Sequence, residues 1–206
     1  MSRALTVFVV DDDHAMRSSL KWLIESVGMQ VETFDSAHAF LDAYYPGRAG
    51  CLLLDVRMPV MSGLELQEYL GRREIRIPVI IITGHGDVAM AVKAMKAGAV
   101  DFIEKPFDDE HLLNSIRKAL QFDEQHRALH ARKAEIAARL AELTPREHEV
   151  MAMVTDGKSN KEIASLLNVS AKTVEVHRAR VMDKMRADSL AELVRMALIA
   201  GGDDDL

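Results

Sequence analysis

The sequence predicts an α/β fold with a parallel five-stranded sheet, followed by a smaller all-α module. Three observations support this: five short apolar runs alternate with helical patterns, the fifth helical pattern is unusually long, and closely spaced helix-start signals follow it. Apolar runs of four to six residues rich in Val, Ile and Leu are typical of strands buried on both faces of a parallel sheet. Repeated strand–helix units place helices on both faces of such a sheet.

The expected strands lie near residues 5–10, 30–34, 51–54, 78–82 and 100–104, and the expected helices near 14–27, 36–45, 63–72, 87–97 and from 109 onward. Gly28 and Gly98 follow two of these helices, where glycine favours a left-handed cap. The last helical pattern continues without Gly or Pro to Pro145. Part of it has the 4-3 spacing of a coiled-coil seam, at Phe122, His126, Leu129, Lys133, Ile136, Leu140 and Leu143. This spacing is compatible both with a solvated linker helix and with a dimerising helix.

Three helix-start signals follow Leu143. Thr144-x-x-Glu147 and Ser159-x-x-Glu162 have the capping-box form, and Ser170 is suited to cap a third helix. Short helices joined by tight turns in this way predict a helix-turn-helix.

The composition indicates the compartment and the partners. The formal net charge is −6, but residues 1–119 have an excess of acids and residues 170–186 an excess of bases, which indicates two modules. The one cysteine, Cys51, lies in an expected strand and indicates a reducing compartment. There is no signal-peptide pattern and no apolar stretch near the ~20 residues of a membrane span. We therefore expect a soluble cytoplasmic protein with no membrane partner.

Polar side chains follow four of the five expected strands. Asp11 and Asp12 follow the first strand, Asp55 the third, Thr83 the fourth and Lys105 the fifth. In a flavodoxin-like strand order, 2-1-3-4-5, the carboxylates become neighbours at the edge where ligands bind. Carboxylates 4 Å apart repel by about 4 kcal/mol per pair at an effective dielectric of 20, and oxygen ligands suit Mg²⁺. This is the chemistry of a phosphoryl-acceptor site, with a cation and a lysine neutralising the phosphoryl oxygens.

Residues 1–120 resemble a response-regulator receiver domain of the FixJ branch. The resemblance rests on the stretches 83–87, 91–96 and 101–107, which read TGHGD, AVKAMK and DFIEKPF. It implies Asp55 as the phosphoacceptor, with Mg²⁺ (or Mn²⁺) held by Asp11, Asp12, Asp55 and the backbone carbonyl of Arg57.

The resemblance also implies a role for Phe102, which stands at a switch position often held by Tyr. Asp13 lies one place beyond the metal carboxylates and is expected to cap the first helix. Val60 replaces a glycine that is common after Met58-Pro59, so the shape of that loop is open.

Residues 144–200 resemble the LuxR/FixJ-type DNA-binding domain, with the helix-turn-helix at 160–179. The matching stretches 143–147, 157–164 and 172–178 read LTPRE, GKSNKEIA and KTVEVHR. Val174, Val181 and Met185 form an apolar stripe on the second helix of the motif, so Lys172, Val176 and Ala179 point away from it.

The N-terminal part of such a helix enters the major groove. Glu175 is suited to accept from a cytosine and Val176 to touch a thymine methyl. His177 lies near the apolar side, where half-buried packing is the alternative to a DNA contact. The expected DNA-binding set is Asn160, Lys161, Ser170, Lys172, Thr173, Glu175, Val176, His177, Arg178, Ala179 and Arg180.

Together these features predict a response regulator with a receiver (1–120), a linker helix (121–142) and a DNA-binding domain (143–206). The expected partners are a sensor histidine kinase, double-stranded operator DNA, a second copy on phosphorylation and, as an option, RNA polymerase. One alternative is a phosphatase or phosphotransferase with Asp55 as nucleophile, although Arg57 stands where haloacid-dehalogenase enzymes have a second Asp. The other is a phosphorylation-independent DNA binder whose receiver serves only for dimerisation.

Overall fold

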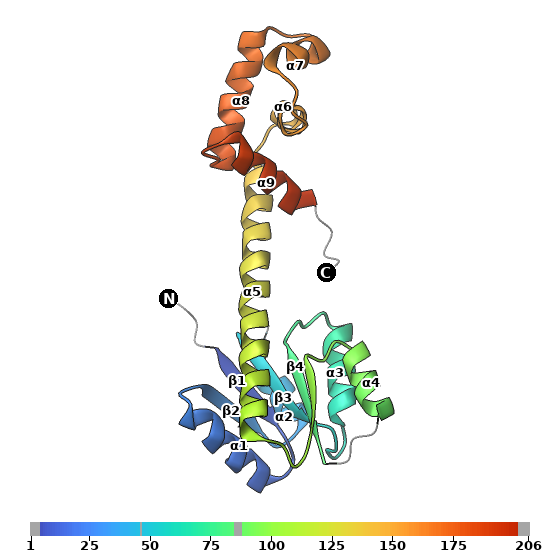
Figure 1. Ribbon diagram of the computed structural model, residues 1–206. Helices are drawn as coiled ribbons and strands as arrows, with labels where there is room; N and C mark the ends of the chain where they lie inside the picture. The colour runs from blue at the N-terminus through green and yellow to red at the C-terminus, as the bar shows by residue number, and fades with distance from the viewer. Residues whose placement is uncertain (1–4, 46, 85–87, 202–206) are drawn as a thin grey trace. The chain divides into compact units, whose positions relative to one another are not determined.

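The computed structural model describes residues 5–45, 47–84 and 88–201. Contacts divide the chain into two compact units, Met1–Arg127 and Ala128–Leu206. The first is an α/β unit and the second is all-α (Figure 1), so the predicted fold class is confirmed. Among the helices that the structure describes, none has the length and apolarity that crossing a membrane requires.

Five parallel strands form one sheet in the order β2-β1-β3-β4-β5, as predicted. The central strands β1, β3 and β4 are buried along their whole length, which explains why they read as continuous apolar runs. The strand bounds are β1 (Thr6–Val10), β2 (Gln30–Phe34), β3 (Gly50–Asp55), β4 (Val79–Thr83) and β5 (Asp101–Glu104).

Helices cover both faces of this sheet (Figure 1). Alternate strand residues point to opposite faces. Phe8 and Val10 therefore pack with α2, α3 and α4, whereas Val7 and Val9 pack with α1 and the first part of α5. The helices of this unit are α1 (His14–Ser26), α2 (Ala37–Ala43), α3 (Gly63–Arg72), α4 (Val88–Lys96) and α5 (Asp109–Ala141). The expected start of the fourth helix at residue 87 lies outside the described residues.

The second unit is a helical module with its own core. Buried side chains of α6, α7 and α8 meet there, including Val150, Ile163 and Val174. Both predicted capping boxes are present, and the Ser170 hydroxyl accepts from the Thr173 backbone N–H at the start of α8. The bounds are α6 (Pro145–Thr155), α7 (Asn160–Leu167), α8 (Ala171–Met185) and α9 (Leu190–Gly201).

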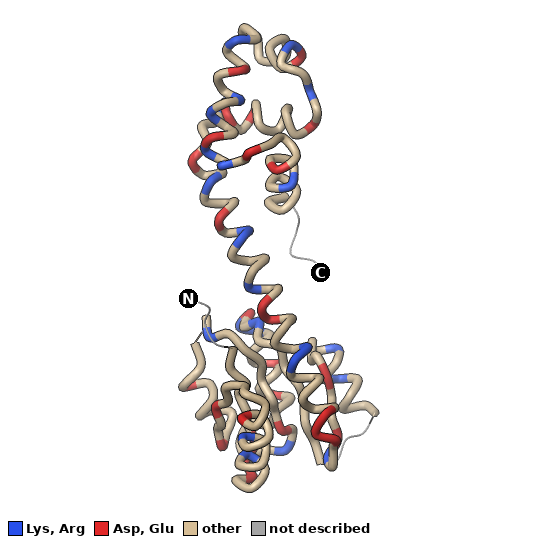
Figure 2. The backbone as a smooth tube through the Cα atoms, turned by 60° about the vertical axis from the view of Figure 1, so that its left-hand side comes forward, with Lys and Arg blue, Asp and Glu red and all other residues tan. Residues whose placement is uncertain are grey.

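The long pattern after Asp108 is one continuous helix, α5, along which acidic and basic residues alternate (Figure 2). Its expected seam is divided between two roles. Ile136 and the following Leu143 are buried in the core of the second unit. Phe122 and Leu129 are instead about half exposed, at 52% and 48%. Only the upstream part of the seam is therefore available to another chain.

A buried carboxylate joins α6 to α8. Glu147 is nearly inaccessible and accepts both from the Thr144 backbone N–H, in the capping box, and from Lys184 Nζ at 2.7 Å. Lys184 Nζ also donates to the Glu142 carbonyl at 2.9 Å. The hydrogen bond from Lys184, with that from Thr144, lowers the pKa of Glu147 to about 2. A neutral side chain at position 147 would weaken the charge-assisted hydrogen bonds from Lys184 and from the Thr144 N–H.

We expect Glu147→Gln to destabilise the second unit by roughly 1–3 kcal/mol at pH 7, since it removes a hydrogen-bonded charge. The folded pKa of Glu147 lies below its ordinary value of 4.5. The stabilisation is therefore complete above pH 4.5 and is lost as the pH falls toward about 2. Native-state amide exchange in α6–α8 at pH 7 and pH 3 measures this difference. Glu149→Gln, which breaks an exposed pair with Arg146 on the same helix, is the matched control; equal effects of the two variants would contradict the assignment.

Candidate functional site

Two carboxylates lie side by side at the carboxyl edge of the sheet. Asp11 directly follows β1, and Asp55 is the last residue of β3. These strands pair with Val10 opposite Leu54, so the two aspartates are neighbours. Both are almost buried, with exposures of 3% and 7%.

One ammonium binds both carboxylates. Lys105, directly after β5, places Nζ 2.9 Å from Asp11 Oδ2 and 2.6 Å from Asp55 Oδ1. The Lys105-Pro106 peptide bond is cis. The main-chain N–H of Lys105 donates to the Thr83 carbonyl at 2.7 Å, which fixes the loop after β5 against the end of β4. Asp11, Asp55, Thr83 and Lys105 therefore lie at one edge of the sheet, as the sequence predicts.

Backbone groups orient the remaining carboxylate oxygens. Asp11 Oδ1 accepts from the Asp13 N–H at 2.8 Å, and Asp55 Oδ2 accepts from the Arg57 N–H at 2.7 Å. Asp13 in turn caps α1 by accepting from the Ala15 N–H, as the sequence predicts. The Arg57 peptide therefore lies beside the Asp55 carboxylate.

A glycine lets α3 begin directly against the end of β3. A Cβ at Gly63 would lie 2.2 Å from the Asp55 carbonyl oxygen, so no larger residue fits without a backbone shift. The Gly63 N–H donates to the Val56 carbonyl at 3.0 Å. This close approach holds the loop that follows Asp55.

Burial and charge act in opposite directions on this site. Burial raises the pKa of Asp55, and the hydrogen bond from Lys105 opposes that effect. Burial lowers the pKa of Lys105, but its hydrogen bonds to Asp55 and Asp11 prevail and raise it. The lysine therefore stays charged, which the two carboxylates require.

The side chains of Asp12, Thr83 and Phe102 differ in exposure. Asp12 is exposed, and in the described part of the chain no group of three or more His, Cys, Asp and Glu side chains lies close enough to hold a metal ion. Thr83 is fully buried. Phe102 is partly buried and already packs against the core shared by α2, α3 and α4.

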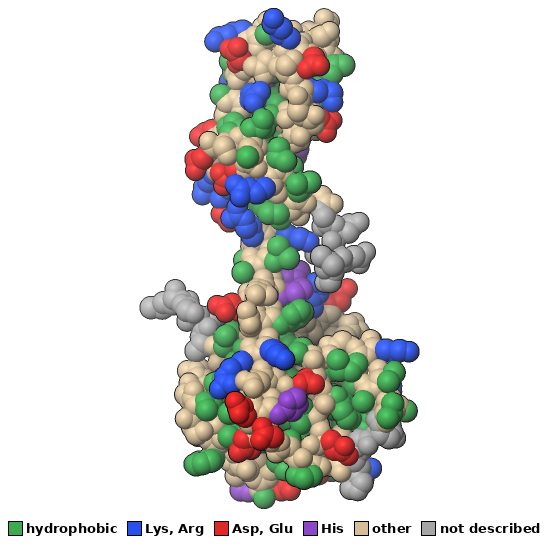
Figure 3. Space-filling model, viewed as in Figure 1, with side chains coloured by type: hydrophobic (Ala, Val, Ile, Leu, Met, Phe, Trp, Pro, Cys, Tyr) green, Lys and Arg blue, Asp and Glu red, His purple; other side chains and the backbone are tan. Residues whose placement is uncertain are grey.

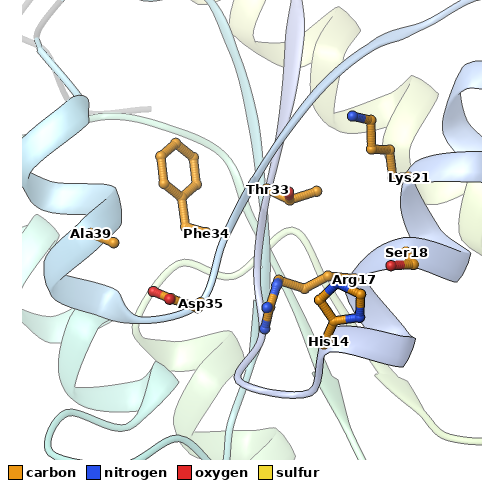
Figure 4. Close-up of a pocket in the computed structure, with 8 residues that line it drawn as sticks. All are labelled: His14, Arg17, Ser18, Lys21, Thr33, Phe34, Asp35 and Ala39. Atoms are coloured by element: carbon orange, nitrogen blue, oxygen red, sulfur yellow. The ribbon is translucent and has the colours of Figure 1, made fainter.

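A hollow of about 390 Å³ lies beside this site, between α1 and the end of β2 (Figure 4). Arg17, in its wall, donates to the Asp11 carbonyl at 2.8 Å, a contact that sequence reasoning missed. The lining residues are His14, Arg17, Ser18, Lys21, Thr33, Phe34, Asp35 and Ala39.

In the second unit, α7 and α8 form the predicted helix-turn-helix. Asn168 has φ 51° and makes the turn between them. The apolar stripe of Val174, Val181 and Met185 is buried, whereas Val176 is 43% exposed. Side chains of both charges occupy the visible face of this unit (Figure 3). The exposed members of the expected DNA-binding set are Lys161, Ser170, Lys172, Glu175, Val176, Ala179 and Arg180.

The remaining members are partly buried, and some are engaged with each other. Arg178 donates to Asn160 Oδ1 at 3.0 Å, which ties α8 to the start of α7. Thr173 also lies partly inside, next to Ser170. His177 is partly buried with Nδ1 unpaired, which matches the packing alternative.

Comparison with known proteins assigns both units. Residues 7–117 match the response regulator receiver domain model, and residues 141–197 match the model of bacterial regulatory proteins of the luxR family. The chain is 52% identical to the transcriptional regulatory protein FixJ of Azorhizobium caulinodans, covering 98% of this chain and 95% of that protein. The chain belongs to the FixJ-type response regulators. The prediction of this family is confirmed, and the FixJ protein of Bradyrhizobium diazoefficiens is 50% identical over 95% of both chains.

Solved structures agree with this assignment. The response regulator StyR has a TM-score of 0.86 at 44% identity, covering 94% of this chain and 98% of that one. Full-length FixJ from B. japonicum has a TM-score of 0.59 at 50% identity, covering 95% and 97%. The protein is thus a two-component response regulator that regulates transcription, not a phosphatase or phosphotransferase. Membership implies a histidine kinase partner, DNA binding and the Mg²⁺ that receiver domains typically bind for phosphorylation.

The loop after Asp55 carries backbone strain. Val60 has φ 68° and is 93% exposed, so a β-branched residue occupies the left-handed region without packing that compensates for it. We expect Val60→Gly to raise the free energy of unfolding of the α/β unit by about 1 kcal/mol, because relief of strain exceeds the entropic cost of glycine. Urea unfolding followed by circular dichroism measures the change. Val60→Ala, which keeps Cβ, should gain little; a loss of stability in Val60→Gly would show that the loop is unstrained.

Proposed function

We propose that this response regulator accepts a phosphoryl group on Asp55 from a histidine kinase and, once phosphorylated, pairs with a second copy on operator DNA. The observation that carries the proposal is the environment of Asp55, a nearly buried carboxylate 2.6 Å from the Lys105 ammonium. The Asp55 oxygen attacks phosphorus while the bond from phosphorus to the donor histidine nitrogen breaks. Lys105 then stabilises the negative charge of the acyl phosphate.

The donor set fits Mg²⁺ in chemistry. Two buried carboxylates share one ammonium, so their negative charge exceeds the charge of Lys105, and the exposed Asp12 adjoins Asp11 in sequence. All available ligands are hard oxygens. We assign the cation to Asp11, Asp12, Asp55 and the backbone carbonyl of Arg57. The N–H of Arg57 already donates to Asp55 Oδ2. A bound Mg²⁺ would supply positive charge to the phosphoryl oxygens.

Two residues next to the site are proposed to sense phosphorylation. The Thr83 hydroxyl, at the end of β4, is assigned to bind a phosphoryl oxygen. Its movement would let Phe102 on β5 pack further inward and reshape the surface of α4 and β5. That surface is the proposed contact with a second copy.

The DNA-reading surface is assigned to the start of α8, which would enter the major groove. Glu175 and Val176 are exposed there and are proposed to read bases. Lys172, Thr173, Arg178 and Arg180 are proposed to bind phosphates. Arg178 also donates to Asn160 Oδ1. The remaining proposed contacts are Lys161, Ser170, His177 and Ala179. Contact with RNA polymerase, and location in the cytoplasm, belong to the same proposal.

We expect acetyl phosphate to label Asp55 only when Mg²⁺ is present, because Lys105 alone leaves the site negative. Mass spectrometry locates the label, and hydroxylamine should remove it, since an acyl phosphate is a mixed anhydride. Asp55→Asn should stay unlabelled, and Asp12→Ala should bind Mg²⁺ more weakly in titration calorimetry. Label on Asp55→Asn, or full labelling without a divalent cation, would overturn the assignment.

We further expect phosphorylation to raise affinity for DNA with two half-sites by roughly 10²-fold or more, because linked domains gain effective concentration. Affinity for a single half-site should change little, since one helix-turn-helix gains no new base contact. Sites selected from random duplex DNA by the phosphorylated full-length protein serve as probes, compared at one salt concentration. Equal affinity of both phosphorylation states for the paired site would favour the phosphorylation-independent DNA binder.

A further inference from the structure

A buried carboxylate on α5 binds the start of β3. Asp123 is 2% exposed, and its Oδ2 accepts from the Gly50 N–H at 2.9 Å, a contact between residues 73 positions apart. The same oxygen lies 2.7 Å from Arg127 Nε. Arg127 also donates to the Arg48 carbonyl at 2.6 Å. We call the group Asp123, Arg127, Gly50 and Arg48 the α5 joint.

The surroundings of the α5 joint are closely packed. A Cβ at Gly50, where φ is 151°, would lie 1.8 Å from the Thr6 carbonyl oxygen, so this position requires glycine. Arg48 stacks on the Phe8 ring at 4.7 Å. Burial, with the nearby Asp123 charge, raises the pKa of the Cys51 thiol. Asp123 is therefore a charge held inside the α/β unit, not a solvated residue of a linker.

The hydrophobic core does not need this charge. The contribution of α5 to the core of the α/β unit ends at Leu120, and Phe122 beyond it is exposed. Burying a carboxylate costs free energy that only good pairing offsets. Beyond Leu120, Asp123 and Arg127 contact the start of β3 and the Arg48 carbonyl before it.

The α5 joint and the phosphoacceptor lie at opposite ends of one strand. β3 begins at Gly50, which binds Asp123, and ends at Asp55; every residue between them is buried. A shift of β3 at one end is therefore transmitted along a packed strand to the other.

We infer that Asp123 is a positioning residue, with Arg127 as its partner, that fixes residues 121–127 on the receiver so that phosphorylation of Asp55 controls the DNA-binding unit. This inference rests on the proposed function, because it assumes that phosphorylation regulates DNA binding. Without the α5 joint, the unrestrained part of α5 begins near residue 121 and the state of the receiver no longer constrains the second unit.

The first experiment measures the α5 joint itself in the full-length protein. Asp123→Asn keeps the shape of the side chain but removes the charge that pairs with Arg127. Amide exchange over residues 121–127, followed by mass spectrometry, should become at least several-fold faster. Glu124→Gln, which removes the same charge from the adjacent exposed residue, should exchange like wild type. Unchanged exchange in Asp123→Asn would overturn the inference.

The second experiment measures coupling. Acetyl phosphate with Mg²⁺ should label Asp55 in Asp123→Asn as in wild type, since the variant keeps Asp11, Asp55 and Lys105, which form the labelled site. The gain in affinity for paired half-sites on phosphorylation should fall from that of wild type to about twofold or less. Arg127→Gln keeps the Asp123–Gly50 contact, so its gain in affinity should lie between the gains of wild type and Asp123→Asn. This second variant tests the inference even if Asp123→Asn folds poorly.

The outcomes separate the two hypotheses. A wild-type gain that Asp123→Asn and Arg127→Gln both retain would overturn the role of the α5 joint and leave the proposed function standing. A wild type whose affinity does not respond to phosphorylation would overturn the proposed function, and the coupling role with it. A gain that is lost in Asp123→Asn and reduced in Arg127→Gln, with normal labelling and a normal Glu124→Gln control, would support the inference.

Discussion

The functional edge of the α/β unit depends on one ammonium between two nearly buried carboxylates. Lys105 Nζ lies within 3 Å of both Asp11 and Asp55. Without it, the carboxylates would repel by about 4 kcal/mol at 4 Å with an effective dielectric of 20. Adjacent acids after β1 and at the end of β3 are therefore tolerated because Lys105, which follows β5, lies at the same edge. The chemistry of the site thus depends on the strand order. Phosphorylation replaces the −1 charge of the Asp55 carboxylate with a phosphoryl group of roughly −1.5 to −2. With Asp11 still charged, the site is then more negative than one lysine neutralises, which favours binding of an additional cation.

Much of this site is predictable from local sequence, because the edge of a parallel sheet is defined by where apolar runs stop. The strand positions, the capping boxes and the cap at Asp13 follow from patterns within a few residues, and the structure confirms them. The strand order was taken instead from the order of flavodoxin-like sheets, and the structure confirms it as well. The helix-turn-helix is predictable for the same reason: the buried stripe of Val174, Val181 and Met185 is set by helical period. Membership of the FixJ-type regulators was predictable from motifs at these same positions.

Contacts between distant residues could not be predicted in this way. Gly50 and Asp123 are 73 positions apart, and neither has a neighbour in sequence that marks the contact. Glu147 was expected as a capping residue, but nothing local indicates its pairing with Lys184. The 4-3 pattern of α5 was ambiguous for a physical reason: one helix contributes to two separate cores, at Leu120 and at Ile136, and the same spacing serves each.

This division of α5 constrains how a receiver can control a DNA-binding unit. The helix is buried in the first unit up to Leu120 and in the second from Ile136, and exposed apolar residues such as Phe122 and Leu129 lie between. A continuous helix transmits orientation only where both of its ends are fixed. The ion pair of Arg139 with Glu135, and the Arg139 donor to the Met185 carbonyl, fix the end nearer α8. The apolar core contacts of α5 in the receiver end at Leu120, and the buried Asp123 carboxylate, with Arg127, extends the attachment by about two helical turns. The cost of burying a charge is then consistent with a regulator in which the receiver must hold its linker in a defined position.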